Sequence, residues 1–251
     1  MKQIISTIFA LLLLCNVKAQ DVFITKGKIE YEKKINLHKT IDGMADGEDR
    51  AWLETFKKVT PQTYTAYFDL SFNDDKTLYK PGRDVVPPQR VNDWLVGPAS
   101  ENIVYSDLDK HQNIALKKVY DNTFLIDDSI RNINWRVTMD TRTIAGFECR
   151  KAVGIIMDSV YVIAFYTDQI IPSGGPESFS GLPGMILGIA IPRLNITWFA
   201  TKLELIDVKT ESLIPPKKGK KITNKELQVQ LKDAMKDWGK NGARNAWLSG
   251  I

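Results

Sequence analysis

Residues 64–72 read Tyr-Thr-Ala-Tyr-Phe-Asp-Leu-Ser-Phe, a stretch in which apolar side chains recur at every second position. Successive side chains of an extended strand point to opposite faces, so this period of two places one face against a core and the other toward water. Aromatic residues, which pack well on a pleated surface, occupy several of these positions. The stretch therefore predicts a half-buried strand of an antiparallel sheet.

The same alternation recurs on both sides of this stretch. It is found in residues 29–37, 133–139 (with Ile133, Trp135, Val137 and Met139 on one face), 149–157 and 196–208. Residues 160–166, in contrast, read Val-Tyr-Val-Ile-Ala-Phe-Tyr and are apolar on both faces. That composition predicts a central strand covered on both sides. The chain is thus expected to be mainly β.

Two helices interrupt the strands. The first is expected near residues 47–58, where Trp52, Phe56 and Val59 recur at helical spacing and Pro61 ends the run. Loops rich in glycine, proline or acidic residues are expected over 39–50 and 80–100.

The second helix is expected over residues 223–239. Thr223 and Glu226 form a capping box, and Gly239 is a natural stop. Its expected apolar face is Leu227, Leu231, Ala234, Met235 and Trp238. A strand-rich body with a helix at its end predicts an α+β fold with an antiparallel sheet. One domain over 20–251 is expected, with a β body to about residue 215, a basic linker over 215–222, this C-terminal helix and a tail.

The first nineteen residues resemble an export signal. Lys2 precedes an apolar run over residues 4–14, and Val17 and Ala19 place small or apolar residues before a cut at Gln20. The run is shorter than the roughly 20 residues that a membrane-spanning helix needs. A lipoprotein signal ending at Cys15 is the alternative, but Leu14 stands where a small residue is required. We expect a periplasmic or outer-membrane-associated protein without a transmembrane segment after cleavage.

Removal of that signal leaves a nearly neutral chain. The loss of Lys2 and Lys18 from 34 basic residues leaves 32 against 30 acidic ones, a net charge of +2. This balance argues against nucleic-acid binding. The basic run at Lys217, Lys218, Lys220 and Lys221 is interpreted as a solvated linker, with a membrane surface or an anionic partner as the alternative. Cys149 would be the single remaining cysteine, so no internal disulfide can form.

Catalytic groups are scarce in this sequence. His38 and His111 are its two histidines, and neither lies near a nucleophile-elbow motif. We therefore predict no catalytic residue, no metal site and no cofactor. Two alternatives stay open. One is a hydrolase that uses Cys149, or Ser178 or Ser180, with His111. The other is a copper(I)-binding protein, in which thiolate and thioether ligands come from Met139, Cys149, Met157 and Met185.

Residues 171–184 are the most unusual stretch. Pro172, Pro176 and Pro183 fix the backbone angle φ, while four glycines permit angles that other residues rarely adopt. The stretch is expected to be a loop of defined shape. It serves either as a structural crossover or as a binding loop beside apolar strands.

Residues 181–186, Gly-Leu-Pro-Gly-Met-Ile, resemble the hexapeptide of the GLPGLI family of exported bacterial envelope proteins, with Met185 in the place of a leucine. The resemblance extends to Trp135 and to the strand Gly-Phe-Glu-Cys-Arg-Lys-Ala at 146–152. It implies a protein without an established activity, built on a curved antiparallel sheet or half-barrel with a C-terminal helix.

By analogy with curved-sheet carriers, the resemblance places a groove near that loop. The expected occupant is an apolar or peptide ligand, or an outer-membrane protein partner. The residues expected to line or gate the groove are Trp135, Cys149, Gly181, Leu182, Pro183, Gly184 and Met185.

Overall fold

A computed structural model describes residues 23–44, 50–85, 91–157 and 159–251. The expected signal peptide, residues 1–19, lies outside the described residues.

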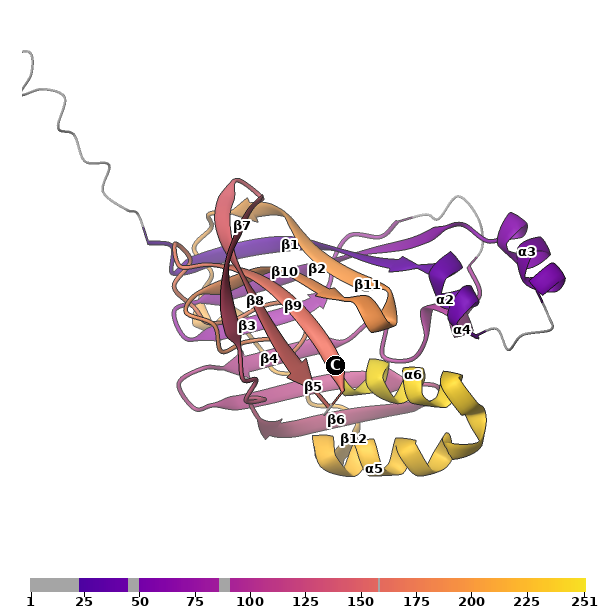
Figure 1. The fold of residues 1–251 in the computed structure, drawn as a ribbon. Coiled ribbons are helices and arrows are strands. Elements are labelled where there is room, and N and C mark those ends of the chain that lie inside the picture. The colour runs from indigo at the N-terminus through magenta and orange to yellow at the C-terminus, as the bar shows by residue number, and fades with distance from the viewer. Residues whose placement is uncertain (1–22, 45–49, 86–90, 158) are drawn as a thin grey trace, which may run out of the picture.

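The described chain is built around one twelve-stranded sheet (Figure 1), ordered β12-β6-β5-β4-β3-β2-β1-β11-β10-β9-β8-β7. Neighbouring strands run antiparallel, apart from β12, which lies parallel to β6. The fold class is confirmed as α+β and mainly β, with an open, curved sheet. The strands are β1 (Lys26–Asn36), β2 (Thr63–Asn73), β3 (Lys76–Pro81), β4 (Ile103–Asp107), β5 (Gln112–Val119), β6 (Asn122–Ser129), β7 (Arg136–Ile144), β8 (Phe147–Ile156), β9 (Val160–Thr167), β10 (Met185–Ile191), β11 (Ile196–Glu204) and β12 (Lys220–Ile222).

Irregular pairing accompanies the curvature. The register shifts between Glu30 and Tyr31 where β1 meets β11, between Ile186 and Gly188 on β10, and between Val137 and Thr141 on β7. An extra residue on one strand of a pair bends that strand and increases its twist. These shifts therefore help the sheet to curl around its inner face.

Large aromatic side chains fill the inner face. Phe68 of β2 stacks on Tyr79 of β3 with the ring centroids 4.9 Å apart, and the indole of Trp198 donates to the Tyr79 hydroxyl at 3.1 Å. Phe68, Leu70 and Phe72 are fully buried, which confirms the alternation of residues 64–72. The apolar side chains at every second position of this strand thus form part of the core.

Two strands are covered differently from the prediction. The stretch 160–166 falls in β9, where Tyr161 is 44% exposed, so this strand is not covered on both faces. The strand that is covered on both faces is β10, in which six of the seven residues are buried. Val137 and Met139 lie on β7, at the edge of the sheet, where the side chain of Met139 is 99% exposed. An edge strand has a neighbour on one side alone, so period-two apolar residues there need not be buried.

The N-terminal helices also depart from expectation. Part of the expected loop 39–50 is helical, in α2 (Leu37–Met44), and the first expected helix is α3 (Arg50–Val59). Leu53 is its buried residue, whereas Trp52 and Val59 face outward. The expected loop 80–100 contains the single turn α4 (Asp93–Val96). Figure 1 shows α2, α3 and α4 gathered at one end of the sheet.

The C-terminal region contains two helices where one was expected. α5 (Asn224–Ala234) begins with the predicted capping box of Thr223 and Glu226, but it ends before Gly239. A 3-10 turn, η3 (Lys236–Trp238), leads to α6 (Gly239–Gly250), which occupies the expected tail. Ala234 and Trp238 are therefore exposed, while Leu227, Leu231 and Met235 are buried. Part of the expected linker forms β12. None of the helices described here is long and apolar enough to cross a membrane.

Candidate functional site

Trp135 contacts the Gly/Pro loop (residues 171–184). The Trp135 indole donates to the Ser180 carbonyl at 2.9 Å. The Ser173 hydroxyl donates to the Leu182 carbonyl at 2.6 Å and accepts from the Gly181 amide at 3.1 Å. These bonds between residues eight or nine positions apart hold the loop in a defined shape.

The end of this loop turns into the core instead of lining a groove. Leu182, Gly184 and Met185 are buried, whereas Gly181 and Pro183 are exposed. Gly184 has a φ of +124°, and a Cβ atom there would lie 2.1 Å from the Thr167 carbonyl oxygen. The glycine is therefore required by close packing between the loop and β9.

Cys149 lies apart from the loop. Arg150 of β8 pairs with Tyr166, and Thr167 of β9 pairs with Met185, so Cys149 is two strands away from Met185. That separation is roughly 10 Å at the usual strand spacing. The Cys149 thiol is fully buried, and burial raises its pKa to about 11. A protonated, enclosed thiol is a poor nucleophile and a poor metal ligand.

The groups of the hydrolase alternative are also separated. His111 is exposed, one residue before β5, and Lys117 lies six residues further along that strand. Lys117 contacts the end of α6, where the Ser178 hydroxyl also binds. Six residues of strand span roughly 20 Å. His111 and Ser178 therefore occupy different parts of the sheet.

The sulfur atoms of the copper alternative do not converge. Met139 is exposed and Cys149 is buried, while Met157 follows the far end of β8. Eight residues of extended chain separate Cys149 from Met157, roughly 25 Å. No three His, Cys, Asp or Glu side chains gather as a potential metal site in the part of the chain that the structure describes.

A surface groove that the sequence did not reveal lies between three distant segments. They are α4 with the loop after it (93–101), the turn between β5 and β6 (118–121), and the stretch from η3 into α6 (238–245). The groove has a volume of about 750 Å³. Trp94, Tyr120 and Trp238 line it and are 48%, 43% and 50% exposed. We call this feature the aromatic groove.

The rings of the aromatic groove are held in fixed positions. Trp94 stacks on Phe56 at 5.8 Å, and Phe56 stacks on Trp52 at 5.3 Å. Across the groove, Trp238 packs edge-on against Tyr120 at 5.7 Å, and Asn245 donates to the Tyr120 hydroxyl at 2.9 Å. Ordered, exposed aromatic rings offer contact area at a small cost in conformational entropy.

The charged side chains of the aromatic groove are mainly acidic. Asp93, Glu101 and Asp121 line it together with one basic residue, Lys118. Carboxylates beside aromatic faces favour positively charged groups, which ring quadrupoles also attract. The lining therefore suits a ligand that carries cationic side chains.

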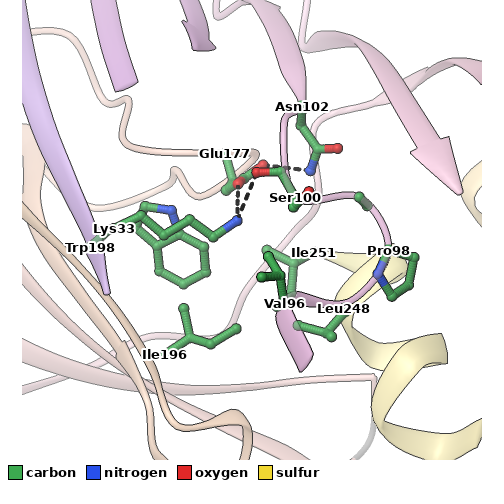
Figure 2. Close-up of a pocket in the computed structure, with 11 residues that line it drawn as sticks. Lys33, Val96, Pro98, Ser100, Asn102, Glu177, Ile196, Trp198, Leu248 and Ile251 are labelled. Atoms are coloured by element: carbon green, nitrogen blue, oxygen red, sulfur yellow. Dashed lines mark hydrogen bonds and ion pairs between the residues drawn. The ribbon is translucent and has the colours of Figure 1, made fainter. Parts of the chain in front are cut away.

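A buried ion pair supports one wall of the aromatic groove (Figure 2). Lys33 of β1 lies 3.7 Å from Glu177 of the Gly/Pro loop and donates to the Ser100 carbonyl at 3.2 Å. Asn102 donates to Glu177 at 2.8 Å. Burial lowers the pKa of Lys33, and Glu177 opposes that effect. Through Glu177, the Gly/Pro loop thus helps to hold residues 100–102 of this wall in place.

The space beside this ion pair is too small for a ligand. It measures about 10 Å³ and is bordered by Trp198, Leu248 and Ile251 as well as by the polar groups. A single water molecule needs about 10–15 Å³. That space therefore does not admit a ligand without a rearrangement.

Comparison with known proteins gives a family match over a short segment. Residues 155–188 match the model of a family described as "Protein of unknown function (Porph_ging)". They run from the end of β8 through β9 and the Gly/Pro loop into β10. No curated protein matches the sequence.

The chain is similar in fold to part of a larger solved protein. A structure of PNGF-II in space group C2 aligns with a TM-score of 0.51 at 15% identity, over 86% of this chain and 33% of that one. The P21 form of PNGF-II aligns with a TM-score of 0.49 at 16% identity, over the same shares of the two chains. An uncharacterised conserved protein from Thermus thermophilus aligns with a TM-score of 0.38 at 8% identity, over 85% of this chain and 98% of that one. This chain spans about a third of the length of PNGF-II, and the likeness concerns the fold alone.

Proposed function

We propose that this chain is an exported envelope protein of the GLPGLI type, and that it binds a peptide segment of a partner protein in the aromatic groove. The observation that carries the proposal is the pairing of three half-exposed aromatic rings with three carboxylates in one groove. The occupant is a segment with lysine or arginine side chains. A surface segment of an outer-membrane protein would fit this description.

The aromatic groove has the composition of a binding surface. Protein interfaces are enriched in tryptophan and tyrosine, and exposed clusters of such rings are uncommon on a monomer without a partner. Trp94 and Trp238 belong to elements about 140 residues apart in sequence, so the fold brings these rings together. The buried Lys33–Glu177 pair and the Gly/Pro loop hold residues 100–102 in place, which is the preorganisation that binding favours.

The proposed role of the Gly/Pro loop is positioning. Trp135 and residues 181–185 order the loop, and Glu177 of that loop holds Asn102 behind the groove. The resemblance of residues 181–186 to the GLPGLI hexapeptide supports this assignment. Trp135 and this hexapeptide stretch thereby contribute to binding indirectly, without contact with the ligand.

Export is proposed from residues 1–19, whose basic start, apolar run and small residues fit a cleavable signal. Fractionation of cells that produce the full chain, followed by N-terminal sequencing, tests this part. A mature protein that begins at Gln20 in the periplasmic or outer-membrane fraction is expected. An uncleaved chain in the cytoplasm would contradict it.

Binding is tested with two fluorescein-labelled hexapeptides that differ in two arginines replaced by citrulline, their neutral isostere. Fluorescence anisotropy is expected to show saturable binding of the arginine peptide alone. Trp94→Ala and Trp238→Ala are each expected to weaken it by about 3- to 30-fold, the contribution of one cation–π contact. Tyr161→Ser, which alters an exposed ring on β9, is the control. Equal affinity for the two peptides, or none for either, would refute the peptide-binding proposal.

A further inference from the structure

The carboxyl end of α6 is held inside the sheet by polar side chains from three separate elements. Lys117 of β5 donates to the Ser249 carbonyl at 3.1 Å. The guanidinium of Arg131, from the connection between β6 and β7, donates to the Gly250 carbonyl. The Ser178 hydroxyl of the Gly/Pro loop donates to the Ile251 carbonyl at 2.6 Å. Three successive carbonyl groups therefore meet three donors.

These donors match the chemistry of a helix end. The last carbonyl groups of a helix lack partners within the helix, and they carry the negative end of its dipole. A lysine amine, a guanidinium and a hydroxyl supply the missing bonds. Ser249 and Ile251 are buried, and Leu248 packs against Gly97 so closely that a Cβ atom there would lie 2.5 Å from Leu248 Cδ1. The end of α6 is thus inserted into a formed site.

The site differs from an ordinary apolar core because it contains several basic side chains. Lys33, Lys117 and Arg131 are these basic groups; Glu177 acts on Lys33 and Lys117, and Asp128 acts on Arg131. Burying cations is costly unless they are paired. Glu177 Oε1 and Asn102 Oδ1 accept no hydrogen bond, although both atoms are buried beside the small cavity under Ile251. Lys117 and Arg131 therefore favour an electronegative group such as a helix carboxyl end, whereas the two orphan oxygens would favour a hydrogen-bond donor.

The helix that fills this site is weak by itself. Gly242 lies inside α6, and a glycine in a helix interior costs about 1 kcal/mol relative to alanine. Gly242 cannot be replaced easily, because a Cβ atom would lie 2.2 Å from the Met235 carbonyl oxygen. α5 begins with its own capping box, whereas no side chain caps the start of α6. The order of α6 therefore depends on docking.

We propose that α6 is a releasable plug, whose carboxyl end occupies in cis a helix-end-binding site formed by Lys117, Arg131 and Ser178. Figure 1 shows this end of the chain directed toward the strands. Trp238, Asn241 and Asn245 line the aromatic groove, so release of the plug also removes one wall of that groove. The effect on ligand binding rests on the proposed function, but the release does not.

Hydrogen exchange of the full chain, read by mass spectrometry, tests the release. Amides of α6 are expected to exchange at least about 30-fold faster than those of the buried strand β10, because local opening exposes α6 without global unfolding. Ser178→Ala and Arg131→Met are each expected to increase the exchange rate of the α6 amides by about a further tenfold and to leave the exchange rate of the β10 amides unchanged. Arg136→Met, at an exposed position on β7, is the matched control. Equal exchange of α6 and β10, rising together in the variants, would overturn the proposal.

A peptide with the sequence of residues 239–251, labelled at its amino end, tests the binding site. It is expected to bind the full chain in a saturable manner, at a rate limited by the opening of α6, and more weakly to Arg131→Met. The reversed sequence is the control. No binding of the peptide to the wild type or to Ser178→Ala would overturn the site. The arginine hexapeptide should slow the hydrogen exchange of the α6 amides. If the hexapeptide does not bind but α6 still opens locally, the proposed binding function is refuted and the proposal of a releasable plug stands.

Discussion

Replacement of Lys117 by methionine is expected to stabilise the protein at neutral pH and to flatten the pH dependence of its stability. Lys117 is 2% exposed, and burial lowers the pKa of its ammonium group from 10.5 to about 7. Arg131 and Lys33 act in the same direction on this pKa, and Glu177 opposes them. The wild-type chain thus places an amine where its ionisation is unfavourable.

The sign of the effect follows from proton uptake. Above pH 10.5 the amine is neutral in both the folded and the unfolded chain. Between pH 10.5 and about 7 the unfolded chain binds a proton that the folded chain does not, so the free energy of unfolding falls as the pH falls. At about 1.36 kcal/mol per pH unit, the loss reaches about 5 kcal/mol at pH 7 and below.

The methionine variant avoids this loss but gives up a contact. It leaves the buried Ser249 carbonyl without the hydrogen bond from Lys117, at a cost of about 1–3 kcal/mol. We therefore expect Lys117→Met to be more stable than the wild type by about 2–4 kcal/mol at pH 7. This advantage should vanish near pH 9, where the remaining ionisation penalty of about 2 kcal/mol equals the cost of the lost hydrogen bond.

Urea unfolding at several values between about pH 7 and 9.5 measures both effects. Lys118→Met, at the exposed neighbouring position on β5, is the control and should retain the wild-type slope. Lys33 remains in both variants, so some pH dependence should persist. Equal slopes for the wild type and Lys117→Met, or a less stable Lys117→Met at pH 7, would refute the reasoning.

Three further outcomes are expected. Gly184→Ala should lower the free energy of unfolding in urea by at least about 3 kcal/mol, because its Cβ atom would collide with the Thr167 carbonyl at a positive φ. The control Gly146→Ala, where nothing lies within 4 Å, should lower it by about 1 kcal/mol. Similar losses in the two variants would contradict this account. Cys149 should resist alkylation at pH 8 until the chain is unfolded, as mass spectrometry would show, and rapid native labelling would mean that the thiol is accessible. Glu177→Gln should lower the free energy of unfolding by about 3–5 kcal/mol, because Lys33 is left as an unpaired buried cation. The double variant Lys33→Met with Glu177→Leu should recover much of that loss. An equally unstable double variant would argue against pairing as the cause.

Local patterns in the sequence predicted much of the secondary structure. The alternation in residues 64–72 and the capping box at Thr223 depend on neighbours a few residues apart, so the sequence was sufficient to predict β2 and the start of α5. The proline and glycine spacing likewise indicated a loop of defined shape, and the bonds from Ser173 and Trp135 show such a loop. The end of α5 was missed because Gly239 begins another helix.

Such local patterns could not predict which strand faces are covered by elements distant in the sequence. β9 and β10 are similarly apolar, but β10 lies between β9 and β11 and is buried on both faces, whereas Tyr161 of β9 faces outward. On β5, Ile114 and Leu116 form the apolar alternation, yet Asn113, Ala115 and Lys117 point into the core. A lysine in such a strand is ordinarily a surface residue. Its burial required the end of α6, which supplies a carbonyl partner.

The candidate site was determined almost entirely by the tertiary structure. Trp94, Tyr120 and Trp238 each stand in unremarkable local sequence, and no spacing rule connects α4, the turn after β5 and η3. Local sequence patterns predicted β1, β2, β7, β8, β9 and β11, the start of α5 and a Gly/Pro loop of defined shape, because each depends on backbone preferences and periodicity over a few residues. The curvature of the sheet and the docking of α6 decided which rings and charges meet, because contacts across more than a hundred residues depend on the packing of the whole chain.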